Sequence, residues 1–324
     1  MTSTLVSGSF KSIMPSVTET CTVIVTPRDR FSIIETCIEK ILEHTPEPFE
    51  LIVVMGGAPE NLKQALHQKY GSKAKLVFEP AYLNTAQLRN IGLRLARTRL
   101  AVCLDTDVYV RPGWLGPLLD CQRETGAGLV VPMVLDKNDV VHTAGNDLFI
   151  TTKGGQKFCT MELRYAQVAV GETTNLKRRE IDFGEVHCHL LIVDAALKLG
   201  VYDETYREGS DIDSGLTLAK AGHSMWVEPS SVVYLYYPDR LDEIDDVRYY
   251  LWKWDLAATR ASFDYFKKKW GMDRTGRDGA SMTYYEMVVR RVGKLTRLWP
   301  IPAVLRLDNF YYRSRKNLRR ALRA

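Results

Sequence analysis

The chain has 324 residues, of which 45% are hydrophobic and 26% are charged, and its formal net charge is +5. This length allows one large or two modest domains, and this composition is that of an ordinary globular protein. No apolar run approaches the roughly 18 residues that a membrane-spanning helix needs, and the Ser/Thr-rich first sixteen residues lack the pattern of a secretion signal. We therefore expect a cytoplasmic protein without a membrane-spanning helix.

The first hundred residues alternate between short apolar strands and amphipathic helices. The predicted strands are Cys21–Val25, Phe49–Val54, Lys75–Glu79 and a run that starts at Leu100. Three helices are predicted between these strands. The first carries the apolar stripe Ile33–Leu42, the second begins at Pro59, and the third extends from an Asn84 cap to about Thr98. This alternation predicts a parallel sheet with helices wound around it. Because no G-x-G-x-x-G motif follows the first strand, a dinucleotide-dependent dehydrogenase is disfavoured.

The fourth strand ends in two acidic residues. The apolar run Leu100–Leu104 leads directly into Asp105 and Asp107, with Thr106 between them. Such a run predicts a strand buried on both faces, and open α/β sheets bind ligands at the carboxyl ends of their strands. Residues two apart on a strand point the same way, so both carboxylates can approach one divalent ion, Mg²⁺ or Mn²⁺, that also holds a phosphate-bearing substrate. The alternative is a solvated turn after the strand.

After Pro112-Gly113 the pattern is less regular. Further strands are predicted at Leu129–Val134, Val140–Ile150, His187–Val193, Met225–Val227 and Val232–Tyr237, the last two separated by Pro229. Helices are predicted at Ala195–Leu199, at Leu216–Ala221 and, with many Tyr and Trp, over Leu241–Trp270. Residues 151–185 show no clear periodicity and are interpreted as loops covering the site. The segment Arg274–Ser281 is interpreted as a linker.

Five short stretches between residues 20 and 237 follow one another in a distinctive order. They are Thr26-Pro-Arg28, Glu50-Leu-Ile-Val-Val54 with its glycine break, Gln87-Leu-Arg-Asn-Ile-Gly92 before Asp105-Thr-Asp107, His142-Thr-Ala-Gly145, and Gly209-Ser-Asp-Ile-Asp213 before a helix that ends Ala221-Gly222. Each stretch is weak by itself. The ordered set resembles the inverting, family-2 type glycosyltransferases with the GT-A fold.

This resemblance implies a fold and a reaction. The fold is α/β, with a Rossmann-like nucleotide-binding half and a mixed-sheet acceptor half in one three-layer α/β/α domain, followed by a helical, basic C-terminal extension. We assign residues 17–240 to this domain, 241–275 to an appended helical segment and 276–324 to a basic tail. The implied enzyme is a hexosyltransferase that moves a sugar from a nucleotide-diphosphate sugar to the hydroxyl of a glycan, lipid or small molecule, with inversion.

The resemblance also assigns chemical roles to the acidic residues. Asp107 binds Mn²⁺ or Mg²⁺ directly, and Asp105 bonds the ribose or supports the ion from behind. The ion stabilises the charge that grows on the departing diphosphate. Asp211 matches the general base that takes the acceptor's proton. A purely structural alternative is that Asp211 or Asp213 caps the following helix.

Other residues are expected to contact the donor or the acceptor. The residues implied for nucleotide-sugar binding are Thr26, Arg28, Gly56, Arg89 and Asp105. For Arg89 the alternative is a solvated helix face shared with Arg94 and Arg97. The residues expected on the acceptor side are His142, His187, His189 and Asp213, although a single histidine is more often structural. Trp252 and Trp254 are expected to pack the appended helices rather than to stack on a sugar.

Three positions depart from the family's pattern. Met55-Gly56-Gly57 stands where an Asp usually contacts the base, so the nucleotide is not determined. Ser210 replaces the Glu that commonly precedes the general base. Leu235 stands where a His often completes the metal site, so the ion is expected to bind weakly, with water in that place, or to arrive with the nucleotide.

Two rival functions explain part of the same pattern. One is a phosphohydrolase that uses Asp105-Thr-Asp107 as nucleophile and acid, but three strand–helix units precede the motif, whereas that class normally opens with it. The other is a non-catalytic module that binds nucleotide sugars, in which the missing Glu and His reflect lost turnover. Transfer or hydrolysis that is lost in Asp211→Asn would exclude the second rival.

The distribution of charge indicates which partners the chain can bind, and its cysteines indicate the redox compartment. Residues 290–324 contain eleven Lys or Arg and one acid, a balance of +10, while the remaining 33 basic and 38 acidic residues give −5. Aromatic residues interleaved with these arginines suit attachment to the anionic inner face of a membrane, and nothing in the chain is typical of reading nucleic-acid bases. The six scattered cysteines, without a CxxC motif, are expected to be reduced core thiols.

Overall fold

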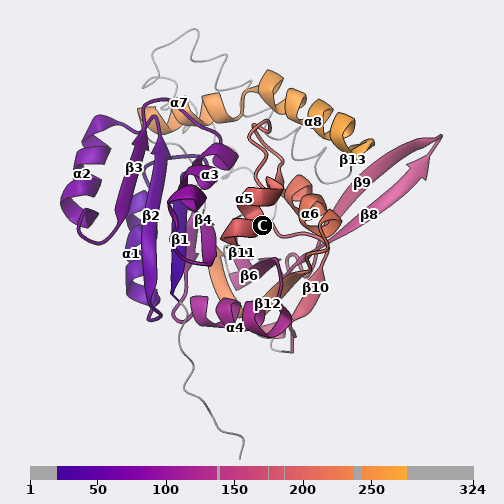
Figure 1. The fold of residues 1–324 in the computed structure, drawn as a ribbon, viewed down its shortest axis with the longest axis horizontal. Coiled ribbons are helices and arrows are strands. Elements are labelled where there is room, and N and C mark those ends of the chain that lie inside the picture. Colours follow the sequence, from indigo (N-terminus) through magenta and orange to yellow (C-terminus); the bar gives the residue numbers. More distant parts are fainter. Residues whose placement is uncertain (1–19, 137–138, 174, 186, 237–242, 276–324) are drawn as a thin grey trace, which may run out of the picture.

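Ten strands form one mixed sheet with helices on both faces, and a smaller sheet projects from its side (Figure 1). The computed structural model describes residues 20–136, 139–173, 175–185, 187–236 and 243–275. The order in the large sheet is β10-β12-β6-β11-β4-β1-β2-β3, with β5 paired to β12 and β7 paired to β6. This arrangement confirms the predicted combination of a wound parallel half and a mixed half.

The parallel half follows the predicted alternation closely. Its elements are β1 (Cys21–Thr26), α1 (Ile34–His44), β2 (Phe49–Gly56), α2 (Glu60–Tyr70), β3 (Lys75–Glu79), α3 (Thr85–Leu95) and β4 (Leu100–Asp105). All six residues of β1 and of β4 are buried, as the apolar runs predict. Asn84 caps α3 through a capping box with Gln87. The β3-β2-β1-β4 order places the end of β4 at the middle of the large sheet.

The mixed half contains elements that the sequence pattern only partly predicted. They are β5 (Val108–Val110), α4 (Leu115–Thr125), β6 (Leu129–Asp136), β7 (Val140–Thr143), β11 (Cys188–Ile192), α5 (Val193–Leu199), α6 (Asp211–Lys220) and β12 (Met225–Leu235). Helix α4 was not predicted. Pro229 does not divide two strands, because β12 passes it with a bulge between Glu228 and Val232. Strand β11 runs antiparallel to both β4 and β6.

The interpretation of residues 151–185 as loops is wrong. They include the last three residues of β8 (Asn146–Lys153) and all of β9 (Gln156–Leu163), with which β8 pairs. They also include a 3₁₀ turn at Val170–Glu172 and β10 (Arg179–Ile181). The β8–β9 hairpin extends outward in Figure 1. The third strand of the small sheet is β13 (Met272–Thr275), which pairs parallel to β9. It includes two residues of the predicted linker.

Two helices follow the large sheet along the chain, in the segment where a helical pattern is predicted. They are α7 (Ile244–Lys253) and α8 (Leu256–Trp270), and Asp255 caps α8 by accepting a hydrogen bond from the amide of Ala258. Both helices lie along one edge of the molecule in Figure 1. The buried carboxylate of Asp246 accepts hydrogen bonds from the amides of Phe31 and Ser32, so α7 is fixed to the loop that follows β1.

The core confirms the three-layer arrangement. One face of the sheet packs against α1, α2 and α4, and the other packs against α3, α5 and α6. All six cysteines are buried and free, as expected. Within the described ranges, the helices are too short or too polar to cross a bilayer. The predicted basic tail, residues 276–324, lies outside the described residues, and the division of the chain at residues 240 and 275 stays a prediction.

Candidate active site

A polar cavity of about 170 Å³ lies at the carboxyl end of the parallel strands. Its walls come from segments that are far apart in the sequence, including the loop after β1, helix α3, the end of β4, the starts of β11 and α6, and helices α7 and α8. The lining side chains used below are Arg28, Arg89, Asp105, Glu185, His187 and Asp211. Four of the residues assigned from sequence to the donor or to catalysis therefore meet in one place.

Asp105 is paired with a buried arginine. Helix α3 packs closely on β1, because a Cβ at Gly92 would overlap the side chain of Ile24. One turn earlier, Nη2 of Arg89 lies 2.6 Å from Oδ1 of Asp105, and both side chains are 1% exposed. Burial alone would raise the pKa of Asp105, but the guanidinium of Arg89 holds it well below its ordinary value. The alternative placement of Arg89 on a solvated helix face is therefore wrong.

Asp107 lies in the turn after β4 and is also buried. The backbone fixes this turn, because Thr106 N–H donates to the carbonyl of Thr26 and Tyr236 N–H donates to the carbonyl of Asp107 at 2.7 Å. Nη1 of Arg28 lies 3.6 Å from Oδ2 of Asp107. Among the described residues, Oδ1 of Asp107 has no hydrogen-bond partner. Burial raises the pKa of the Asp107 carboxyl; Arg28 opposes this rise, and the charge of Asp105 adds to it.

The donor atoms at the end of β4 fit a divalent ion. One atom each from Asp105, Asp107 and His187 lies within 4.8 Å of the other two, and all three residues are buried. Two carboxylates and an imidazole suit Mn²⁺, and carboxylates alone suit Mg²⁺. The unpartnered Oδ1 of Asp107 is an acceptor that such an ion would satisfy. Leu235 supplies no ligand, because its hydrocarbon side chain has no donor atom; it is fully buried in the core and pairs with Val108.

His187 lines the cavity beside Asp105. The N–H of Asp105 donates to the carbonyl of His187 at 2.9 Å, and Nδ1 of the imidazole lies 3.4 Å from Oδ2 of Asp105. Nη1 of Arg28 contacts the same ring, 2.5 Å from Nδ1. The sequence placed His187 on the acceptor side only because it lies on a predicted strand of that half. In the structure, the pairing of β11 with β4 brings its side chain beside Asp105.

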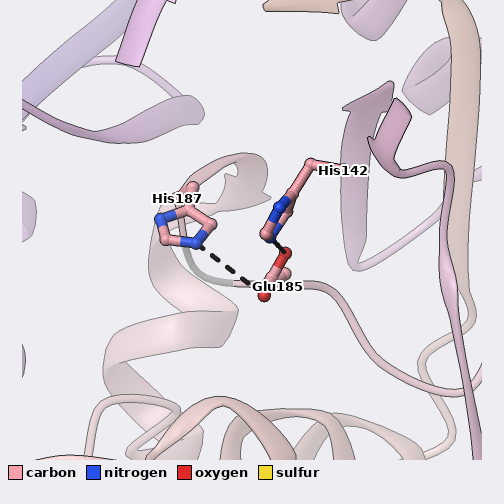
Figure 2. A group of neighbouring side chains, drawn as sticks. All are labelled: His142, Glu185 and His187. Carbon is pink, nitrogen blue, oxygen red and sulfur yellow. Dashed lines mark ion pairs between the residues drawn. The ribbon is translucent and has the colours of Figure 1, made fainter. Parts of the chain in front are cut away.

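Glu185 stands between two imidazoles (Figure 2). Its Oε2 lies 3.0 Å from Nε2 of His142, and its Oε1 lies 3.8 Å from Nε2 of His187. Burial would lower the pKa of His142, but the charge of Glu185 raises it to about 9. Burial would raise the pKa of Glu185, and the charge of His142 lowers it well below its ordinary value. His142 and Glu185 therefore form an ion pair at neutral pH.

Asp211 and Asp213 occupy the first turn of α6, but only Asp211 lines the cavity. Oδ1 of Asp211 lies 3.3 Å from Nη2 of Arg274, which comes from β13. The Ncap residue is Ser210, and its side chain makes no capping hydrogen bond. Neither aspartate is therefore the cap that the structural alternative proposed.

Asp213 is fully buried and accepts several hydrogen bonds. Its partners are the hydroxyl of Tyr206 at 3.0 Å, Nε1 of Trp270 at 2.7 Å and Nζ of Lys269 at 3.0 Å. The structure does not bring this side chain to the cavity. The acceptor-side role of Asp213 stays a prediction, and the geometry instead joins α6 to α8.

Three other predicted residues do not line the cavity. Thr26 is buried beside Asp105 on the neighbouring strand. Gly56 ends β2, where a Cβ would come within 2.7 Å of the carbonyl of Ala81. His189 is buried and bonds the hydroxyl of Tyr202, which in turn lies against the guanidinium of Arg89. Their predicted contacts with the donor or acceptor stay predictions.

Several residues of the cavity were not found from the sequence. Glu185 falls in the segment that lacks periodicity, and Arg274 in the predicted linker. Lys253 is 2% exposed, with Nζ 3.2 Å from Glu208 and 3.7 Å from Asp29. The sequence did offer one sign that Lys253 is unusual, because it is a charged residue on the apolar stripe of α7. Trp252 packs against Tyr249, as predicted, but Trp254 also lines the cavity.

Comparisons with known proteins relate this chain to one family. The model of the family described as "Glycosyl transferase family 2" matches residues 22–196. Glycosyltransferase GlyG of Streptococcus pneumoniae is 22% identical over 202 residues, which are 61% of this chain and 62% of that protein. Pre-mycofactocin glycosyltransferase of Mycobacterium tuberculosis is 24% identical over 161 residues, 49% of this chain and 31% of that one. The chain thus spans less than two thirds of these relatives.

Two solved structures share the arrangement of elements. GalNAc-T7, solved with UDP, GalNAc and Mn²⁺, has a TM-score of 0.54 at 15% identity, over 75% of this chain and 49% of that one. TarS 1–349 of S. aureus, solved in complex with UDP-GlcNAc, has a TM-score of 0.51 at 12% identity, over 78% of this chain and 73% of that one. At these identities the likeness concerns the fold.

Proposed function

Because the chain belongs to glycosyltransferase family 2 and has the GT-A fold, we propose that it transfers a sugar from a nucleotide-diphosphate sugar to an acceptor hydroxyl, with inversion. The observation that carries this proposal is the convergence of Asp105 and Asp211 on one cavity, together with the unpartnered oxygen of Asp107. The order of elements supports it over a phosphohydrolase, since three strand–helix units precede Asp105.

The donor's diphosphate is expected to lie at the end of β4. A divalent ion held by Asp107 and Asp105 would supply Lewis-acid stabilisation of the leaving diphosphate. Arg28 lines the cavity and can donate hydrogen bonds to phosphate oxygens. Arg89 is already bonded to Asp105, so its role is to keep that carboxylate ionised and fixed. Both structural neighbours were solved with uridine nucleotides, which makes UDP-sugars the first donors to test.

Asp211 is the proposed general base. Its carboxylate accepts the proton of the acceptor hydroxyl while that oxygen attacks the anomeric carbon from the face opposite the diphosphate. Arg274 orients this carboxylate from one side and also donates to the carbonyl of Gly209. The carboxylate therefore has a fixed direction toward the cavity. The acceptor glycan, lipid or small molecule enters from this side.

The first experiment measures thermal shifts with UDP, GDP, ADP and TDP, each with and without Mn²⁺. Binding to the folded state raises the melting temperature by mass action, so a shift that needs both nucleotide and Mn²⁺ identifies the donor class. Transfer from the matching nucleotide sugar is then followed by NMR, where inversion gives a product whose anomer is opposite to the donor's. Nucleotide binding without transfer or hydrolysis would favour the non-catalytic module.

The basic tail is proposed to attach the enzyme to an anionic membrane surface, which suits a lipid-linked or cell-envelope acceptor. The charge of residues 290–324 supports this assignment. Co-sedimentation with vesicles of phosphatidylglycerol and phosphatidylcholine tests it on the full chain and on a variant that lacks residues 290–324. Equal binding by both proteins would contradict the proposal.

A further inference from the structure

The ring of His187 lies between an acid of the metal-binding pair and a second acid behind it. Nδ1 is 3.4 Å from Oδ2 of Asp105, and Nε2 is 3.8 Å from Oε1 of Glu185 (Figure 2). The side chain is 2% exposed. One imidazole therefore has a nitrogen on the side of the expected ion and the other nitrogen on the side of a carboxylate.

The backbone sets this position. His187 immediately precedes β11, and its carbonyl accepts a hydrogen bond from the N–H of Asp105. The next residue, Cys188, pairs with Leu104 in the β11–β4 ladder. The imidazole is thus fixed relative to Asp105 by the sheet, in the way that a metal ligand needs.

The contact with Arg28 shows that the ring edge carrying the two nitrogens already faces a cation. Nη1 of Arg28 lies 2.5 Å from Nδ1 and 2.9 Å from Nε2 of His187. Because a guanidinium can only donate hydrogen bonds, at least one of these two nitrogens offers it a lone pair. The same Nη1 is 3.6 Å from Oδ2 of Asp107. A positive group therefore already lies between an imidazole lone pair and the acidic pair. A divalent ion would use the same donors.

Glu185 lies beside Nε2 of the ring at an ion-pair distance of 3.8 Å, which is longer than a hydrogen bond. Its second oxygen is held at 3.0 Å by Nε2 of His142, and Nδ1 of His142 lies 3.9 Å from Oδ2 of Asp136. The two imidazoles meet edge to face, with an interplanar angle of 74°. A carboxylate behind a ligating histidine fixes its tautomer and orientation and makes it a better ligand.

We propose that His187 is the third protein ligand of the divalent ion at Asp105-Thr-Asp107, and that Glu185, held by His142, is the positioning residue behind it. The inference rests on the proposed function in one respect, namely that a divalent ion binds at Asp105-Thr-Asp107. It assigns to β11 the imidazole that Leu235 cannot supply from β12. A separate ion bound by His142, Glu185 and His187 is the competing arrangement, and His187 cannot serve both ions with the same nitrogen.

The test uses the full chain and MnCl₂ without nucleotide, so that the protein supplies every ligating nitrogen. Pulsed electron paramagnetic resonance is expected to show nitrogen coupling to bound Mn²⁺ in the wild type and in His67→Ala, a control that removes an exposed imidazole from α2. His187→Ala should lose the coupling and bind Mn²⁺ about a hundredfold more weakly. Glu185→Gln should keep the coupling and bind about tenfold more weakly.

The outcomes separate this inference from the proposed function. Absence of nitrogen coupling in the wild type, at an MnCl₂ concentration at which calorimetry shows that the ion is bound, overturns the inference without any variant, even where Mn²⁺-dependent transfer is observed. Coupling that survives in Asp107→Asn but disappears in His142→Ala also overturns it, because the ion would then lie in the competing arrangement. Coupling that follows the expected pattern in a protein without transfer activity supports the metal ligand and contradicts the proposed function.

Discussion

Two Asp-x-Asp pairs, one at the end of β4 and one at the start of α6, have opposite geometries. The carboxylates of Asp105 and Asp107 converge, with donor atoms within 4.8 Å of each other. Asp211 and Asp213 diverge, so that one lines the cavity and the other is buried among α8 side chains. Asp105 ends β4 and Asp107 lies in the turn that follows, which brings its carboxylate back beside that of Asp105. Residues two apart in a helix lie about 200° apart around its axis. The same sequence pattern therefore brings two carboxylates together at one end of the sheet and separates them on the helix.

The two pairs also differ in how their buried charges are satisfied. Asp213 accepts hydrogen bonds from Tyr206, Lys269 and Trp270. Asp107, equally buried, has an oxygen without a partner among the described residues. A buried acid with a full set of donors stabilises the fold, whereas one with too few donors costs stability unless a ligand completes it. The comparison predicts that Asp107 serves function and Asp213 serves stability.

Asp107→Asn is expected to have the largest effect. Loss of the charge should lower turnover by about 10³-fold or more and weaken Mn²⁺ binding, because the leaving diphosphate loses its stabilisation. The melting temperature should not fall, since burial raises the pKa of Asp107 and its ionised form is costly at neutral pH. Steady-state kinetics measure the turnover, and thermal unfolding measures the melting temperature. A lower melting temperature with normal turnover would reverse the roles assigned to the two pairs.

Asp211→Asn is expected to lower turnover by about 10²-fold to 10³-fold, because the acceptor hydroxyl loses its base. The affinity for nucleotide and Mn²⁺, measured by calorimetry, should stay unchanged, since the ion's ligands are untouched. Asp264→Asn is the matched control, because that residue is exposed on α8. Loss of nucleotide affinity in Asp211→Asn would place this carboxylate with the donor instead.

Asp213→Ala is expected to destabilise the fold by about 3 kcal/mol, because it leaves Lys269 and Trp270 without their common acceptor. Urea unfolding measures the change, and Asp264→Ala should stay within about 0.5 kcal/mol of the wild type. A raised KM for the acceptor at unchanged stability would instead support the acceptor-side role predicted from the sequence.

The sequence predicted one half of the molecule better than the other for a physical reason. Buried strands such as β4 and a capped helix such as α3 are determined by local patterns. The strands β8 and β9 are not, because β8 is mostly exposed and the third strand of their sheet, β13, comes from far along the chain. His187 was recognised as a polar residue on a strand, but its place beside Asp105 depends on the pairing of β11 with β4. Local patterns identify side chains, and long-range pairing decides which of them meet.

The smallest expected effect concerns Asp203, whose carboxylate also contacts α8. Burial would raise its pKa, but hydrogen bonds led by that from Lys269 lower it to about 2. A depressed pKa contributes stability that is present above the ordinary value near 3.8 and is lost as the pH falls through about 2. Asp203→Asn should therefore cost about 1 kcal/mol at pH 7, allowing for solvent screening of a partly exposed group, and less as the pH falls from 4 to 3. Urea unfolding of the wild type and of Asp203→Asn at pH 7, 5, 4 and 3 measures the difference in their free energies of unfolding. A difference that does not change with pH would show that the hydrogen bonds of Asp203 matter rather than its charge.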